Sequence, residues 1–195
     1  MSDQRYEVRH NRKVHTGFVN LDIFDATITK GPRRVDISRE VHDHGHGACV
    51  LPYDPARKTA LLVRQLRVPA HLVTGDGLIL EAAAGVLDPE DPSPAFGAQR
   101  EAREELGYDV HDLRPVGRFF TIPGLVTEQM SCFLATYDPS DKVDGDTGAD
   151  ADEVLDVEEW TLADLWTAYE DGVLTDLKTV VCLLTLRMEE PSLFT

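Results

Sequence analysis

The chain has 195 residues, enough for one domain with a substantial hydrophobic core and a small extension. Its 19 basic and 35 acidic residues give a net charge of −16, which argues against general nucleic-acid binding and against adhesion to anionic membranes. There is no signal peptide, and no apolar run approaches the roughly 20 residues that span a bilayer, so we expect a cytoplasmic location.

The N-terminal part is predicted to form a small β-hairpin. Residues 17–29 alternate apolar and polar side chains as a half-exposed strand does, and a Lys-Gly-Pro break separates them from a second strand at Val35–Val41. A two-stranded hairpin is only marginally stable alone. We therefore expect residues 1–45 to be an extension that packs on the main domain, residues 46–195, or on a second subunit.

Apolar runs in the main domain predict strands and helices in mixed order. Strands are expected at Ala48–Tyr53, Thr59–Val68, 77–85, Leu113–Thr121, Gln129–Tyr137 and Val154–Trp160. Helices are expected at 93–107, at 161–172 and at Asp176–Met188. Residues 138–152 are polar and acidic and are predicted to be a mobile loop. Strands interleaved with three helices indicate a single α/β layered domain.

The three cysteines give no sign of a crosslink. Cys49, Cys132 and Cys182 each lie within apolar or strand-like runs, far apart in the sequence. We interpret them as small buried residues and not as a disulfide framework or a zinc cluster.

The helix at 93–107 can be predicted from its ends and its apolar stripe. Ser93 is a favourable N-cap, Pro94 suits the first helical position, and Gly107 provides a left-handed stop. Gly97 alone opposes the assignment, at a cost of about 1 kcal/mol relative to alanine. The stripe recurs at three- and four-residue spacing, at Ala95, Ala98, Ala102 and Leu106.

This helix crowds carboxylates together. Glu101 and Glu105 lie one turn apart along one edge of the stripe, whereas Glu104 is rotated toward Arg100. Like charges at this spacing cost about 0.2–0.5 kcal/mol per pair. Two stacked carboxylates can share a hard cation such as Mg²⁺, with Arg100 and Glu104 as a supporting pair.

A glutamate-rich helix face is most often only solvated, so the context has to decide. The apolar stretch GLILEAAAG at 77–85 predicts a buried strand that ends in a tight turn. An acidic, proline-broken loop, DPEDPSP, then leads into the carboxylate helix. This order of elements favours a functional site over a solvated surface.

Strand, glycine turn, loop and the REAREELG helix together resemble the Nudix box of the Nudix hydrolases. Gly85 matches the first glycine of that pattern, and Asp91 stands where a loop glutamate is expected, in a loop that is one residue longer. Tyr108 replaces the final aliphatic residue. The second half of the box is matched by Arg100, Glu101, Ala102, Glu104, Glu105 and Gly107.

The resemblance implies an α/β fold, the Nudix α/β/α sandwich around a mixed sheet, with an N-terminal β-hairpin extension. It covers roughly residues 46–190 and is nearest to the ADP-ribose and GDP-mannose pyrophosphatase branch. Its supporting stretches are 39–55, 61–70, 121–138 and 171–186. Enzymes of this branch are commonly homodimers that exchange N-terminal strands, and we expect the same of this chain.

The implied reaction is Mg²⁺-dependent hydrolysis of the pyrophosphate of a nucleoside diphosphate sugar, with Mn²⁺ as an alternative ion. The sequence does not separate GDP-mannose from ADP-ribose as substrate. Glu101 and Glu105 are the expected metal ligands, with the Ala84 carbonyl as an extra one. Arg100 and Glu104 are expected to support them.

The sequence leaves the roles of three further carboxylates open. Glu81 is either a metal- or substrate-facing carboxylate or an exposed residue at a strand end. The resemblance places the catalytic base on a late acidic loop, here 145–153, where Glu153 aligns best. Glu128, beside a Pro-Gly turn, is the competing candidate for the base and for a substrate contact.

Two residues are expected to bind substrate. Arg67 matches a substrate-binding arginine of the branch, and a guanidinium suits a diphosphate, although a surface salt bridge is the ordinary explanation. His44 stands where GDP-mannose members carry an arginine. Together with His42 and His46 it would share one strand face, as zinc ligands do, but we favour a polar strand end.

A second class of function remains open. A non-catalytic sensor of nucleotide sugars or ADP-ribose on the same fold would need no hydrolysis. Sensors typically lose the helix carboxylates, which this chain has kept, so the enzyme is preferred.

Overall fold

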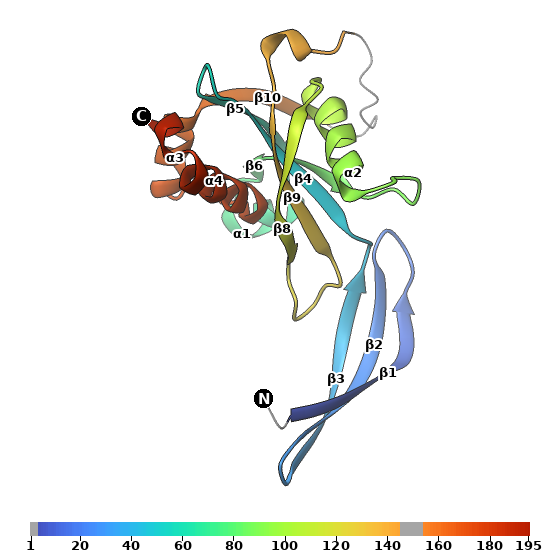
Figure 1. Cartoon of the computed structure of the whole chain (residues 1–195). Coiled ribbons are helices and arrows are strands. Elements are labelled where there is room, and N and C mark those ends of the chain that lie inside the picture. Colours follow the sequence, from blue (N-terminus) through green and yellow to red (C-terminus); the bar gives the residue numbers. More distant parts are fainter. Residues whose placement is uncertain (1–3, 145–153) are drawn as a thin grey trace. The chain divides into compact units, whose positions relative to one another are not determined.

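The computed structural model describes residues 4–144 and 154–195 (Figure 1). The chain divides into two compact units, one of residues up to His46 with Phe120–Gln129, the other of Gly47–Phe119 with Met130–Thr195. The strands are β1 Gln4–His15, β2 Asn20–Lys30, β3 Arg33–Asp43, β4 Gly47–Asp54, β5 Thr59–Leu66, β6 Leu78–Glu81, β7 Ala83–Val86, β8 His111–Phe120, β9 Gln129–Thr136 and β10 Leu155–Thr161. The helices are α1 Val68–Thr74, α2 Pro94–Glu101, α3 Leu162–Glu170 and α4 Leu177–Glu189.

The N-terminal unit is a three-stranded antiparallel sheet in the order β1-β2-β3. The predicted hairpin corresponds to β2 and β3, which pair from Asn20 opposite Asp43 to Lys30 opposite Arg33. The sequence analysis missed β1, because its run of charged residues gives only a weak alternation. Every residue of β1 is exposed in the single chain.

The second unit is built on a seven-stranded mixed sheet. Its main path runs β10-β5-β4-β9-β8, with β6 paired to β5 and β7 paired to β4. Strands β4 and β9 are parallel, whereas β5 runs antiparallel to β4, β6 and β10. The expected mixed sheet is confirmed.

Strand β4 shows why the unit forms three layers. All its residues are buried, and alternate side chains enter two separate cores. Ala48 and Val50 pack with the apolar stripe of α2, whereas Cys49 and Leu51 pack with α3 and α4. Figure 1 shows α2 on one side of the sheet and α3 with α4 on the other. The predicted α/β/α sandwich is therefore confirmed.

Two predicted strands differ from the structure. The strand at Thr59–Val68 ends at Leu66, and Val68 begins the short helix α1, with a proline in its first turn. The stretch 77–85 is two strands, because β6 pairs with β5 and β7 pairs with β4. At the break, the amide of Ala82 donates to Thr179 Oγ1 of α4 at 2.7 Å.

Across residues 4–144 and 154–195, no helix has the length and apolar character needed to cross a membrane.

Candidate active site

The carboxylate helix begins and ends where the sequence predicts. Ser93 Oγ accepts the amide of Phe96 at 3.2 Å, and Gly107 adopts a left-handed φ of 71°. Its last turn, Ala102–Leu106, is π-helical, which the sequence analysis did not predict. Such π-turns are frequent at functional sites, because they rotate side chains relative to a regular helix.

Glu101 and Glu105 both turn inward, toward β7. Their exposed fractions are 8% and 3%, and Glu105 Oε2 accepts the amide of Ala84 at 2.9 Å. A Cβ atom built on Gly85 would collide with the carboxyl group of Glu101. Gly85 lies within β7, paired with Ala48 of β4, and not in the predicted turn; it leaves the space that the Glu101 carboxyl group fills.

Arg100 contacts Glu101 of this pair and two further carboxylates. It donates to Glu101 Oε1 at 2.8 Å, to Glu104 Oε2 at 2.7 Å and to Asp91 Oδ2 at 3.1 Å. Burial lowers the pKa of Arg100, but these three carboxylates outweigh burial and raise its pKa above the ordinary value. The expected pairing of Arg100 with Glu104 is present in the structure.

Asp91 ties the preceding loop to the helix. Its Oδ2 also accepts the amide of Asp88 at 2.9 Å, and the ion pair with Arg100 holds the pKa of Asp91 below its ordinary value. The loop packs against Gly97, where a Cβ atom would lie 2.5 Å from Leu87 Cδ2 and 3.0 Å from Asp91 Oδ2. Close packing of the loop explains the glycine that opposed the helix prediction.

A second ionic cluster surrounds Glu81, which is 3% exposed and so is not the exposed strand-end residue of one interpretation. Arg67 donates to its two carboxylate oxygens at 2.7 and 3.0 Å, and Lys178 contacts Oε2. Lys178 also lies 3.1 Å from Asp176 Oδ1. Burial raises the pKa of Glu81, but the two cations outweigh it and lower the pKa below the ordinary value.

The two clusters act on each other electrostatically. The hydrogen bond to Glu81 raises the pKa of Arg67, burial lowers it, and the charges of Glu81 and Glu105 add to the rise. The structure thus brings together the predicted residues Arg67, Glu81, Ala84 and Glu105, with Glu101, Arg100 and Glu104 beside them on the same helix.

Three predicted residues are not among the described residues of the unit that carries this site. Glu153 lies outside the described residues. His44 and Glu128 belong to the N-terminal unit, where the ring of His44 stacks on Phe18 at a centroid distance of 6.1 Å. The backbone carbonyl of Glu128 accepts the amide of Thr121 at 3.4 Å. The other two histidines do not join His44 in a metal-binding group among the described residues.

Sequence reasoning missed Lys178 and the contact of Asp91 with Arg100. A signal for Lys178 is present, because it is the one charged residue in the first turns of α4. Its partner Glu81 is 97 residues away, so the pair depends on how α4 packs on the sheet.

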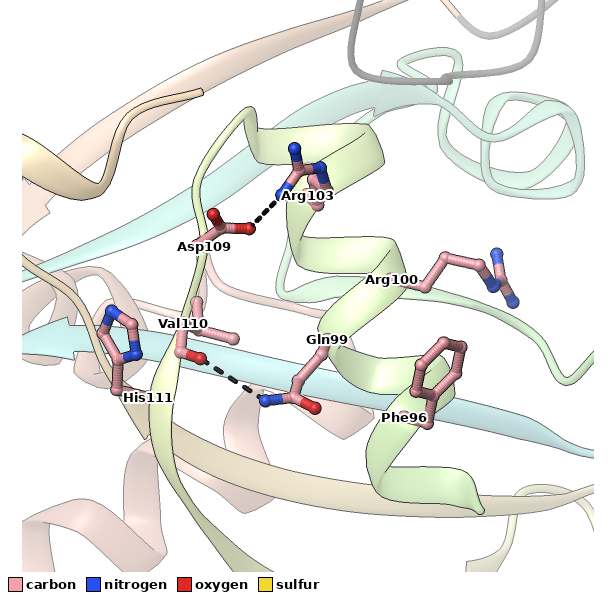
Figure 2. A pocket seen from close by; sticks show the side chains of 7 residues that line it. All are labelled: Phe96, Gln99, Arg100, Arg103, Asp109, Val110 and His111. Atoms are coloured by element: carbon pink, nitrogen blue, oxygen red, sulfur yellow. Dashed lines mark hydrogen bonds and ion pairs between the residues drawn. The ribbon is translucent and has the colours of Figure 1, made fainter. Parts of the chain in front are cut away.

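A pocket of about 450 Å³ lies on the other flank of α2 (Figure 2). Figure 2 shows Gln99 and Arg103 pointing toward Val110 and Asp109, with Arg100 pointing away from them. Arg103 pairs with Asp109 at 2.6 Å. Neither Glu101 nor Glu105 lines this pocket, but Arg100, which donates to Glu101, does.

The carboxylate site suits a hard divalent cation. Glu101 and Glu105 supply anionic oxygens, and the backbone of β7 lies beside them. Oxygen donors of this kind are what Mg²⁺ prefers, with water and phosphate in the remaining positions. The donor set and its burial therefore fit such an ion.

Comparisons with known proteins point to one family. Residues 43–180 match the NUDIX domain. The GDP-mannose pyrophosphatase of Cronobacter sakazakii (strain ATCC BAA-894) is 39% identical over 152 residues, which are 77% of this chain and 78% of the relative. That of Yersinia pestis (strain Pestoides F) is 38% identical over 162 residues, 82% of this chain and 79% of the relative.

A solved structure agrees at the level of the fold. The crystal structure of ADP compounds hydrolase superposes with a TM-score of 0.74, covering 98% of this chain and 96% of the other. Because the two sequences are only 17% identical, this likeness concerns the fold alone.

Proposed function

Since the chain belongs to the Nudix hydrolase family, we propose that it hydrolyses the pyrophosphate of GDP-mannose to GMP and mannose 1-phosphate. The observation that carries the proposal is the buried pair Glu101 and Glu105 beside Gly85 of β7. The relatives named GDP-mannose pyrophosphatase favour this substrate over ADP-ribose, because they align with about three quarters or more of this chain.

Nudix hydrolases generally need divalent cations, and we propose Mg²⁺ here, with Mn²⁺ as a substitute. Glu101 and Glu105 would hold the ion, with the Ala84 carbonyl as a further ligand. When bound, the ion supplies charge neutralisation of the diphosphate and activation of water.

The surrounding residues hold this pair in place. Arg100 and Glu104 orient the Glu101 carboxyl group through the 2.8 and 2.7 Å contacts. The amide of Ala84 orients Glu105. A carboxylate that is already held in position loses little conformational freedom when it binds an ion. A site on a helix and a strand provides this positioning.

Arg67 is proposed to bind the diphosphate. Two of its five N–H donors are used by Glu81, which fixes the plane of the guanidinium. Its side chain is 44% exposed, so the remaining edge is accessible to a phosphate group. Because Arg67 and Lys178 already engage Glu81, we assign Glu81 chiefly to orienting Arg67 and keep metal binding by Glu81 as a second role.

The catalytic base is proposed to be Glu153 or Glu128. Either carboxylate would accept the proton of the attacking water. The substitutions Glu153→Gln and Glu128→Gln separate the two, because only loss of the base lowers kcat strongly and removes the acidic limb of the pH profile of kcat. A substrate-binding role for Glu128 or His44 would instead appear in KM.

The test of the proposed function is product analysis with Mg²⁺ and a panel of nucleoside diphosphate compounds. We expect GMP and mannose 1-phosphate from GDP-mannose, with a higher kcat/KM than for ADP-ribose. A sensor would bind a member of the panel, detectable by calorimetry, without forming products. If compounds of the panel bind and none of them is hydrolysed, the protein is a sensor and not an enzyme.

A further inference from the structure

Three cysteines from distant parts of the chain meet in the core. Cys49 of β4, Cys132 of β9 and Cys182 of α4 have sulfur atoms that all lie within 4.8 Å of one another. Their exposed fractions are 0%, 2% and 0%. The prediction that they are buried is confirmed, but no pattern in the sequence indicated that they would meet.

The geometry of the cluster is set by the fold. Cys49 and Cys132 are direct partners in the parallel β4–β9 pair, so both side chains leave the same face of the sheet. Cys182 reaches them from α4, where its thiol lies 3.6 Å from the carbonyl oxygen of Phe133. All three are free cysteines in the structure, so each can offer its sulfur atom to a ligand.

The thiols interact with one another. The neighbouring thiols of Cys49 and Cys182 lower the pKa of Cys132 despite its burial. The same contacts raise the pKa of Cys49. Lys178 also favours a negative charge on Cys132.

The number of donors and their burial restrict the ligand. Among the described residues, the group contains no carboxylate or imidazole that could serve as a fourth ligand. Three thiolates would leave Zn²⁺ with a net charge of −1 and short of its usual four ligands, and would leave Cu⁺ with a net charge of −2. A charge is costly in an apolar core. A trivalent, three-coordinate centre bound by three thiolates is neutral.

We propose that Cys49, Cys132 and Cys182 form a binding site for one trivalent thiophilic centre of the arsenite class. Arsenous acid, As(OH)₃, would exchange its three hydroxyl groups for three sulfur atoms. Three S–H bonds and three As–O bonds break, three As–S bonds form, and three water molecules leave. No electron is transferred, so the step needs no oxidant or reductant.

The required movement is limited. A trivalent arsenic centre keeps a lone pair, so its three ligands form a pyramid, and with bonds of about 2.3 Å the sulfur atoms lie about 3.3–3.5 Å apart. Sulfur atoms that are within 4.8 Å of one another therefore need to approach by at most about 1.5 Å. Because the site is buried, entry needs a local opening, and we expect slow binding.

The test uses the reduced full-length chain with arsenite. Native mass spectrometry is expected to show one arsenic atom per chain in place of three hydrogen atoms. Each of the substitutions Cys49→Ala, Cys132→Ala and Cys182→Ala should weaken uptake at least tenfold. Absence of uptake by the wild type, or wild-type uptake by all three variants, would overturn the site.

Two further measurements keep the proposal testable if a variant fails to fold. In the wild type, bound arsenite should protect all three thiols from alkylation of the native protein, as mapped by peptide mass. Alkylation at the same rate with and without arsenite would count against it. An excess of Zn²⁺ should not displace the arsenic, and displacement would show that the ligand class is wrong.

Discussion

At the scale of single residues, Gly85 is required for space and not for backbone conformation. A Cβ atom at this position would occupy the place of the Glu101 carboxyl group, because β7 and α2 approach so closely. No comparable contact surrounds Gly124, where a Cβ atom would meet nothing within 4 Å. The two glycines therefore form a matched pair for substitution.

We predict that Gly85→Ala lowers kcat/KM for GDP-mannose by about 100-fold, since a displaced Glu101 loses about 3 kcal/mol of charge stabilisation. The fold should survive, because the side chain can swing outward. Steady-state kinetics with Mg²⁺ measures the loss, and Gly124→Ala is the control. Equal activity of the two variants would show that Glu101 need not occupy that space.

Glu81 links the site to the acid stability of the protein. Its pKa in the folded protein lies below the ordinary value of 4.5, because Arg67 and Lys178 outweigh the effect of burial. A lowered pKa stabilises the fold fully above about pH 4.5, and this stabilisation is lost as the pH falls through the folded pKa.

Glu81→Gln is predicted to cost about 2–3 kcal/mol at neutral pH, because the largely buried Lys178 loses a partner. The cost is not larger, because Arg67 is partly exposed to water and Lys178 keeps its contact with Asp176. Below about pH 4.5 the variant should lose stability less steeply than the wild type. Urea unfolding across this pH range measures both effects, with the exposed Glu170→Gln as control. Parallel pH curves would contradict the assignment.

At the scale of elements, helix α2 is shaped by the loop that packs on it. Gly97 costs the helix about 1 kcal/mol in propensity, yet a side chain here would meet Leu87 and Asp91. Asp91 in turn holds Arg100. Gly97 therefore lowers the intrinsic stability of the helix and at the same time allows the loop to pack closely on it.

We predict that Gly97→Ala does not yield the gain of about 1 kcal/mol expected from propensity, and that it destabilises the protein by up to about 2 kcal/mol through overpacking. Chemical denaturation measures the change. Ala163→Gly, at an exposed position of α3, measures the propensity contribution separately. A gain in stability from Gly97→Ala would mean that the loop does not press on the helix.

Local signals predicted the elements that begin and end with strong cues. Helix α2 was predicted from Ser93 and Gly107, and the structure caps and ends it at these residues. The helix α1 and the split of 77–85 were missed, because both depend on which strand is the neighbour and not on local pattern. Tertiary pairing overrides propensity in such short segments.

The same limit applies to the site. Glu101, Glu105, Arg100 and Glu104 lie on one helix, so their spacing predicted their arrangement. The contacts of Lys178 and the meeting of three cysteines join residues that are far apart in the chain, and one sequence carries no signal for such distances.

At the scale of the whole molecule, β1 leaves apolar side chains uncovered. Tyr6 is 73% exposed and Val8 is 56% exposed in the single chain. Both alternate with charged residues along the strand, so they share one face of the sheet. An uncovered apolar face on a terminal sheet supports the proposed homodimer with exchanged N-terminal strands.

We predict that the full-length chain is a dimer by size-exclusion chromatography with light scattering. The double substitution Tyr6→Ser and Val8→Ser should shift it toward the monomer, because it removes apolar area from the interface. Glu7→Gln, on the opposite face of the strand, is the control and should leave the dimer intact. A monomeric wild type would contradict the exchange of strands.

The account depends on Glu101 and Glu105 as ligands of a divalent cation. The most direct measurement is a titration with Mn²⁺ followed by electron paramagnetic resonance, on the wild type and on the double variant Glu101→Gln/Glu105→Gln. We predict that the variant keeps its fold and binds Mn²⁺ about 10–100-fold more weakly than the wild type does. A folded double variant that binds Mn²⁺ as tightly as the wild type would contradict the account.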